Sequence, residues 1–188
     1  MSAVFTPQRR KLSAEQFERM GETGILDPKA RVELLAGEMI EMAPIGSRHA
    51  AGVCYLARRF ILAVGDAALV RTQSPLRLAD DSEPQPDLLL LRPRPDYYRS
   101  AHPRPADVLL LVEVADTTLA FDRETKLPLY AQHGVPEVWI LDVAAERLEI
   151  CREPGPGGYR RRLERQGTES IAPLALPAVA LEVGTVFA

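Results

Sequence analysis

The stretch Val108-Leu-Leu-Leu-Val-Glu-Val-Ala115 is an apolar run that contains a single carboxylate, Glu113. Such a run, with charged residues on either side, predicts one strand covered on both faces, because a strand with one solvated face alternates apolar and polar residues. Burying a carboxylate there without a partner would cost several kcal/mol in desolvation. We therefore expect Glu113 to meet a metal ion, a lysine or water at the end of its strand.

A second carboxylate stands at the start of another apolar strand, where Pro86-Asp87 precedes Leu88-Leu-Leu-Leu91. Acids on neighbouring strands are a common way to hold Mg²⁺ or Mn²⁺. Further along the chain, Asp122 and Lys126 are four residues apart and would share one face of a helix. A metal-dependent phosphodiesterase also needs a cation that orients the attacking water, and Lys126 supplies that residue type.

The length of 188 residues and the hydrophobic content of 46% predict one domain over residues 1–188 with a core of its own. The apolar runs are far shorter than the roughly 20 residues that cross a bilayer, and the N-terminus lacks the order of a signal peptide. We expect a cytoplasmic protein without a membrane partner. Cys54 and Cys151 lie in unlike contexts, which predicts two packing residues rather than a disulfide.

The net charge of −3 argues against a chain that coats nucleic acid through positive charge alone. It does not exclude an enzyme that acts on nucleic acid, because acids gathered around a metal lower the net charge. Arg and Tyr are mixed in residues 92–104 and 159–162, a composition that suits phosphate contact and base stacking. A solvated Arg-rich surface is the simpler interpretation, since Arg supplies 20 of the 23 basic residues.

The N-terminal third predicts a short helix, a hairpin and a long helix. Ser13 and Gln16 have the spacing of a capping box, so a helix should begin at Ala14 and end by Gly21 or Gly24. Residues 31–35 and 38–42 flank Ala36-Gly37, which favours a hairpin. Ser47 is placed to cap a helix that ends at Gly65. The apolar face of this helix contains Val53, Leu56, Ala57, Phe60 and Val64.

The remaining pattern predicts strands at 69–72, 76–78, 88–91, 108–115, 137–142 and 147–151, and short strands near the C-terminus. Residues 79–86 should form an acidic, solvent-facing loop. The prolines of residues 92–106 indicate a long loop or a flap. A helix should precede His133-Gly134, with a kink at Pro128 unless its first full turn starts near Glu124 or Thr125. Together these elements predict a mixed α/β fold, with a central mixed sheet flanked by helices.

Several segments, taken in order, carry a resemblance to a known family. These are Arg31–Pro44 with His49, Pro86-Asp87, Glu113-Val114 followed by Asp122 and Lys126, and Tyr130–Asp142. As a set they resemble the Uma-two family of restriction-endonuclease-like proteins, a branch of the PD-(D/E)XK nuclease superfamily. The match is specific as a set, whereas Pro-Asp alone would carry no weight.

This resemblance implies a restriction-endonuclease-like core and a Mg²⁺- or Mn²⁺-dependent endonuclease acting on DNA. It implies that Asp87 and Glu113 are catalytic metal ligands, and that Glu33 is an auxiliary ligand. The superfamily usually places a lysine two residues beyond the second acid, but here that position is Ala115. The resemblance suggests that Lys126 does the work of that lysine. It also makes a homodimer plausible, because cutting both strands calls for two sites.

Simpler interpretations exist for each residue. Asp87 would merely open a strand, and Glu113 would pair with an arginine. Glu33 would face solvent on a hairpin, and Lys126 would only pair with Asp122 along a helix. His49, in the first turn of a helix, is expected to be a surface or packing residue, and Trp139 and Tyr130 are expected to lie in the core.

Two other functions stay open. One is a catalytically silent module that keeps the nuclease fold to bind nucleic acid or protein, and the displaced lysine motivates it. The other is a metal-dependent hydrolase of a small phosphodiester, which the acidic net charge favours.

Overall fold

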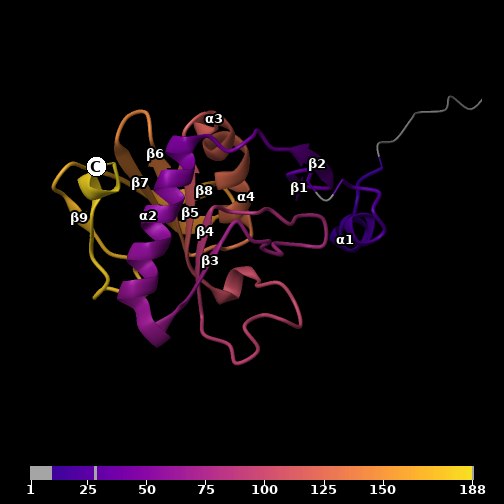
Figure 1. Cartoon of the computed structure of the whole chain (residues 1–188), viewed down its shortest axis with the longest axis horizontal. Helices are drawn as coiled ribbons and strands as arrows, with labels where there is room; N and C mark the ends of the chain where they lie inside the picture. The colour runs from indigo at the N-terminus through magenta and orange to yellow at the C-terminus, as the bar shows by residue number, and fades with distance from the viewer. Residues whose placement is uncertain (1–9, 28, 188) are drawn as a thin grey trace, which may run out of the picture.

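A six-stranded mixed sheet forms the centre of the computed structural model, which describes residues 10–27 and 29–187 (Figure 1). The strand order is β3-β4-β5-β6-β7-β8. Their bounds are β3 Leu69–Thr72, β4 Leu88–Leu91, β5 Val108–Ala115, β6 Glu137–Asp142, β7 Arg147–Gly155 and β8 Gly158–Gln166. Strands β5 and β6 are parallel, and the other neighbours are antiparallel. The predicted mixed α/β fold with a central sheet is confirmed.

Helices and two small sheets complete the fold. The α-helices are α1 Ala14–Glu22, α2 Ser47–Val64, α3 Leu119–Phe121 and α4 Leu127–Gln132. A π-helical turn, Asp122–Lys126, joins α3 to α4, and 3₁₀ turns occupy Gly65–Ala67, Pro105–Asp107 and Val183–Val186. The predicted hairpin is β1 Val32–Leu35 with β2 Glu38–Glu41, and a second pair joins β9 Ser170–Ile171 to β10 Leu181–Glu182.

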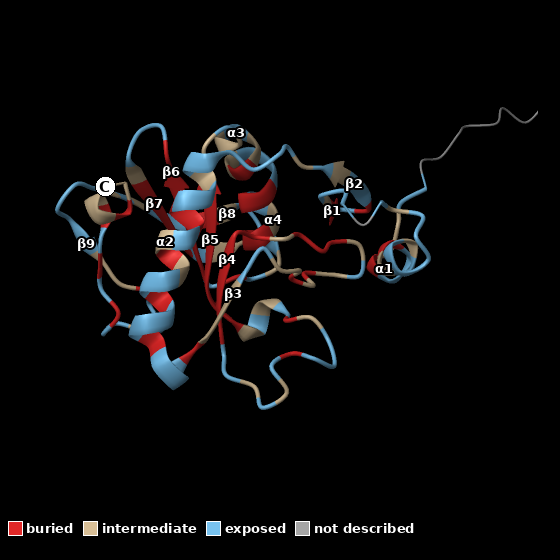
Figure 2. Cartoon of the chain, in the orientation of Figure 1, coloured by how far each residue is buried: buried red, intermediate tan, exposed pale blue. Residues whose placement is uncertain are grey.

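The sheet is covered on both faces, as the apolar run of β5 predicts. Every residue of β5 and β6 is buried (Figure 2). Side chains alternate along β5, so Val112 and Val114 join a cluster with Leu56 and Phe60 of α2. Leu111 and Ala115 join the opposite cluster with Leu127 and Tyr130 of α4. Glu113 lies between Leu111 and Ala115 in this alternation, so its side chain belongs to the α4 face.

The connection between the parallel strands β5 and β6 runs through α3, the π turn and α4. The N–H of Leu127 bonds the carbonyl of Asp122, five residues back, which widens the helix by one residue. Pro128 is the second residue of α4. Proline has no N–H and its ring crowds the carbonyl four residues back, so the irregular turn falls where an ordinary α-helix would be disrupted. The expected irregularity at Pro128 is thus a wide turn immediately before it.

The short elements of the N-terminal region form largely as predicted. Ser13 Oγ accepts a hydrogen bond from the Gln16 N–H, and Gln16 Oε1 accepts one from the Ser13 N–H, which completes the capping box. In the hairpin, Ala36 and Gly37 have φ of 49° and 83°. Positive φ at both central residues is the signature of the type I′ turn, whose twist matches that of the flanking strands.

Three local predictions are wrong. The N-cap of α2 is Gly46, and Ser47 is the first helical residue. Residues 76–78 are not a strand, because their N–H groups bond the carbonyls of loop residues Pro84, Pro103 and Ser82. The acidic loop 79–86 is not solvent-facing throughout, since Ser82 and Glu83 are buried.

The two cysteines lie in different environments, one exposed and one buried. Both are free, and Cys151 is buried as predicted. Cys54 is exposed on α2, so it is not a packing residue. No helix within residues 10–27 and 29–187 combines the length and the apolar character needed to span a membrane.

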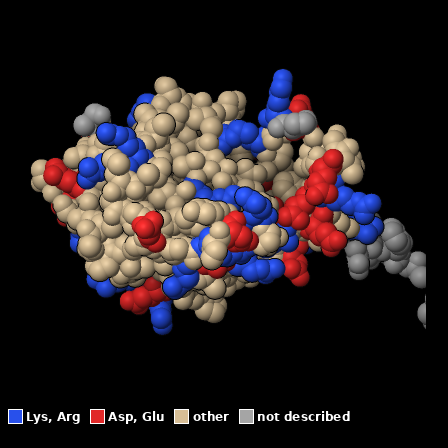
Figure 3. Space-filling model, turned by 60° about the horizontal axis from the view of Figure 1, so that its bottom comes forward, with Lys and Arg blue, Asp and Glu red and all other residues tan. Residues whose placement is uncertain are grey.

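Residues 92–104 form an irregular loop held by its own contacts. Arg94 pairs with Asp96 at 2.5 Å and stacks on the ring of Tyr98, whose hydroxyl donates to the Arg92 carbonyl. On the face that carries this loop, basic and acidic side chains are interspersed (Figure 3). The loop follows β4, whereas Asp87 precedes it, so the loop and that acid lie at opposite ends of the strand. This placement argues against a flap over Asp87.

The α2–sheet contact predicts a large difference between two leucines of the same helix. Leu56 is fully buried and Leu62 is 71% exposed. Leu56→Ala should lower the free energy of unfolding by about 2–5 kcal/mol, because it leaves a cavity against the sheet. Leu62→Ala should change it by no more than about 0.5 kcal/mol. Urea denaturation of both variants measures this, and equal effects would contradict the assignment of the buried face.

Candidate active site

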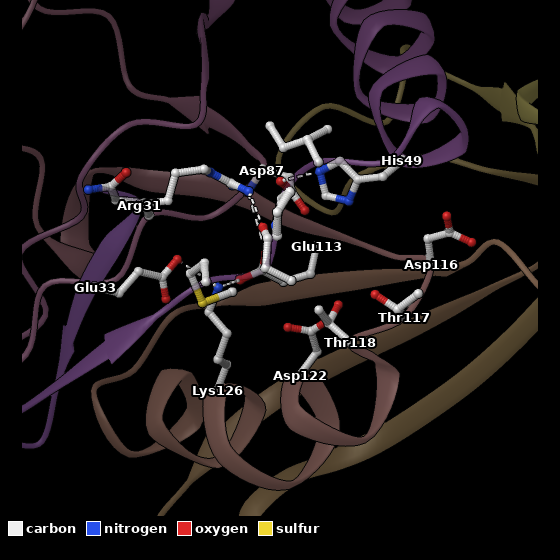
Figure 4. A pocket seen from close by; sticks show the side chains of 16 residues that line it. Arg31, Glu33, His49, Asp87, Glu113, Asp116, Thr117, Thr118, Asp122 and Lys126 are labelled. Atoms are coloured by element: carbon white, nitrogen blue, oxygen red, sulfur yellow. Dashed lines mark hydrogen bonds and ion pairs between the residues drawn. The ribbon is translucent and has the colours of Figure 1, made fainter. Parts of the chain in front are cut away.

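A polar pocket lies where the hairpin, α2, the ends of β4 and β5, and the π turn meet (Figure 4). Its lining includes all the residues predicted for the site, together with one arginine, one histidine and two further acids. They are Arg31, Glu33, His49, Asp87, Glu113, Asp116, Asp122 and Lys126. The fold thus brings together side chains from five separate segments of the chain.

Glu113 is the central acceptor of the pocket. Its Oε1 lies 2.9 Å from Lys126 Nζ and accepts a hydrogen bond of 2.5 Å from the Tyr130 hydroxyl. Its Oε2 faces the N–H of Asp87 at 3.4 Å. Burial raises the pKa of Glu113 to about 8, although the charge of Lys126 opposes this effect. The buried carboxylate of Glu113 therefore has two partners, Lys126 and Tyr130.

Lys126 bridges two acids from distant parts of the chain. Its Nζ lies 2.9 Å from Glu113 Oε1 and 3.3 Å from Glu33 Oε1, and its side chain is 2% exposed. Burial disfavours the charged amine, but the nearby carboxylates, Glu113 foremost, outweigh this and raise the pKa of Lys126. The simpler alternative for Lys126, an ion pair with Asp122 alone, does not describe these contacts.

Asp87 is held by contacts to both of its oxygens. Oδ2 accepts a hydrogen bond of 2.9 Å from the Val114 N–H, and Oδ1 lies 2.9 Å from His49 Nε2. The adjacent carboxylate of Asp87 is the main cause that raises the pKa of His49. The sequence predicts a surface or packing residue at position 49, whereas the structure places His49 in the pocket against Asp87.

Two further residues contact or line the site; Asp122 is already marked by its spacing from Lys126, whereas Tyr130 is expected only in the core. Tyr130 is fully buried, as predicted for a core residue, but it also donates to Glu113. Asp122 is buried and accepts a hydrogen bond of 2.6 Å from Thr118, and burial raises the pKa of Asp122. The signal was present in the spacing, because Asp122, Lys126 and Tyr130 follow one another at intervals of four residues and share one helix face.

The donor set of the pocket fits a divalent cation with hard oxygen ligands. Five carboxyl groups line it, together with the basic side chains of Arg31, Lys126 and His49. Glu33 Oε2 is buried and has no hydrogen-bond partner among the described residues. Carboxylate oxygens are the ligands that Mg²⁺ and Mn²⁺ prefer. Glu33, Asp87 and Glu113 therefore match the chemistry that such an ion requires.

A second acidic group lies elsewhere and fits a cation less well. Glu18, Glu83 and His102 form a cluster whose ligand atoms are all within 4.8 Å of one another. However, Arg77 lies 2.5 Å from Glu18 and 2.6 Å from Glu83, so both carboxylates already pair with an arginine. We therefore assign no ion to this cluster.

The mixed sheet with its pocket of acids and one lysine is the arrangement that the resemblance to nuclease-like proteins predicted. A family model described as "Uma2: Putative restriction endonuclease" matches residues 14–184, and the chain belongs to this family. The resemblance drawn from the sequence is thereby confirmed.

A solved structure shares the fold over nearly its whole length. It is the crystal structure of "a putative nuclease belonging to DUF820" from Anabaena variabilis, with a TM-score of 0.70 and 12% sequence identity. The similarity covers 94% of this chain and 97% of the other. At this identity the comparison establishes the fold alone. A search among curated proteins gave no match.

The buried acids predict that the metal-free protein loses stability as the pH rises. The pKa of Glu113 is raised from 4.5 to about 8, so its contribution is complete below pH 4.5 and is lost as the pH rises through 8. The raised pKa of Asp122 acts in the same direction. The free energy of unfolding should fall by up to about 1.4 kcal/mol per pH unit in this window. Urea denaturation in chelator from pH 5 to 8 measures it.

Glu113→Gln is the control for this measurement, because the amide does not titrate. Its profile should be flatter than that of the natural chain between pH 5 and 8. A natural chain whose stability increases over this range would contradict the raised pKa of Glu113.

Proposed function

We propose that the chain is a Mg²⁺- or Mn²⁺-dependent endonuclease that hydrolyses phosphodiester bonds of DNA. The family and the fold are those of a nuclease, and the metal and the DNA substrate are the proposed part. The observation that carries the proposal is the buried arrangement of Lys126 between Glu113 and Glu33, beside Asp87. This arrangement combines the acids and the cation that phosphodiester hydrolysis requires.

Each residue has a proposed role. Asp87, Glu113 and Glu33 would hold the ion, which would polarise the phosphate and make bound water more acidic. Lys126 keeps a positive charge beside the position of the attacking water and offsets the charge that develops on the phosphate. His49 and Tyr130 act as positioning residues, because they contact Asp87 and Glu113 respectively.

The position of Lys126 supports its role in place of the lysine that the superfamily usually carries at position 115. Ala115 is buried in the cluster that packs against α4, and its side chain shares a face with that of Glu113. Lys126 approaches Glu113 from the helix that covers this same face. Lys126 thus contacts Glu113 from the covering helix, whereas a lysine at position 115 would lie beside Glu113 on the strand.

Three further properties remain proposals. We propose that residues 1–188 form one domain and that the protein acts in the cytoplasm. We also propose a homodimer whose interface does not involve the edge strand β8. The exposed residues of edge strand β8 include Arg160, Arg162 and Glu164. Charges on an edge strand oppose pairing with another edge, so a dimer would use a different surface.

Cleavage of supercoiled plasmid and single-stranded DNA in Mg²⁺, Mn²⁺ or EDTA tests the proposed activity. Cutting should need the metal, and Glu113→Ala and Asp87→Asn should each lower the rate by about 10²–10³-fold. Leu62→Ala, purified in parallel, is the matched control and should cut at the natural rate. Metal-dependent cutting that survives Glu113→Ala would overturn the assignment of the site.

The displaced lysine favours one alternative, a catalytically silent module that binds nucleic acid or protein. The two functions differ in the expected effect of Lys126→Met. For an endonuclease, this variant should lose about 10²-fold in kcat while calorimetry still detects Mn²⁺ binding. Circular dichroism must show that it is folded, since the change leaves buried acids unpaired.

Glu33→Gln provides a milder variant for the same comparison, because the amide keeps the size of the side chain. It should weaken Mn²⁺ binding and keep the fold. For a silent module, the natural chain would bind no divalent metal and would retain its DNA affinity in chelator. Hydrolysis of a model phosphodiester without any cutting of polynucleotides would instead indicate a small-molecule hydrolase.

A further inference from the structure

The reacting groups of the candidate site lie below the protein surface. The exposed fractions are 2% for Lys126, 3% for Glu113 and 7% for Asp87. A phosphodiester must nevertheless come within hydrogen-bond distance of Lys126 to react there. The scissile phosphate therefore has to leave the surface and enter the pocket.

The pocket is too small for a nucleoside. Its volume is about 130 Å³, whereas clefts that enclose drug-sized ligands span roughly 300–1,000 Å³. The space suits one phosphate group and an ion. The sugars and bases on either side of that phosphate must therefore stay at the rim.

Two arginines hold the rim in place. On one side the connector between β2 and α2, residues 42–46, lines the pocket, and Arg31 donates to the Ala43 carbonyl at 2.8 Å. On the other side lie residues 116–118, and Arg48 of α2 lies 3.4 Å from Asp116. The walls are thus tied to neighbouring elements.

A base-paired strand cannot easily place a single phosphate in this pocket. Duplex DNA is stiff over roughly 50 nm, and lifting one phosphate out of its helical path disrupts stacking of the adjacent bases. An unpaired strand turns its backbone freely and leaves the faces of its bases open. The rim offers such bases an apolar contact, because Pro44 and Ile45 line the pocket and Ile45 is 42% exposed.

We propose that the site acts on a nucleic-acid strand that is unpaired at the scissile phosphate. This inference rests on the proposed function and specifies its substrate. One phosphate enters the pocket and a flanking base lies against Ile45.

The test uses the full chain and three labelled substrates of one sequence: a single strand, a complete duplex, and a duplex with a central bubble of unpaired bases. In Mn²⁺ the single strand should be cut at least tenfold faster than the duplex, and cuts in the third substrate should fall within the bubble. Equal rates on single strand and duplex, or cuts in the paired arms, would overturn this inference and leave the endonuclease intact. An absence of cutting on all three would overturn the proposed function itself.

Ile45→Ser tests the rim separately from the chemistry. It should raise KM for the single strand roughly fivefold and change kcat by less than that. Leu62→Ser, an apolar-to-polar change at an exposed position of α2 outside the pocket, is the control and should alter neither. An unchanged KM for Ile45→Ser would contradict base contact at the rim. A single-stranded RNA of the same sequence shows whether the site distinguishes ribose from deoxyribose. Cutting of both the single-stranded RNA and the single-stranded DNA would support the requirement for an unpaired backbone.

Discussion

The ion pair between Lys126 and Glu113 is the constraint on which the rest of the site depends. Both groups are buried, so either charge alone would be strongly unfavourable, and each requires the other to be in place. Glu113 is fixed by the register of β5 in the sheet, and Lys126 by the π turn. The hairpin then adds Glu33 to the same amine, which ties the N-terminal region to the sheet.

Much of this arrangement follows from sequence, because burial and periodicity are local signals. The run that contains Glu113 predicted a strand covered on both faces, and the capping box at Ser13 predicted the start of α1. The less successful predictions depended on tertiary context. Leu76 lies in a loop because its N–H finds the Pro84 carbonyl rather than a neighbouring strand, and Glu83 is buried because Arg77 offers it a counter-charge.

The candidate site was only partly predictable for the same physical reason. Asp87 and Glu113 stand out because each is a charge at the end of an apolar strand or within one, and Lys126 stands out through its spacing from Asp122 and the family resemblance. His49 carried no such signal, since its contact with Asp87 depends on how the first turn of α2 is placed against the end of β4. The hydroxyl of Tyr130 was equally hidden, because a tyrosine at an apolar helix position is an ordinary core residue until its partner is known.

The π turn has a consequence for how this protein tolerates changes in chain length. Such a turn is equivalent to one extra residue in an α-helix, and each residue of an α-helix advances the chain by about 100°. A deletion of one residue within 122–126 would restore an ordinary α-helical turn and would change which side chains of this segment face Glu113. The position of Lys126 therefore depends on the number of residues in this turn as well as on their identities. Insertions or deletions within 122–126 are the sequence changes that would indicate loss of the site.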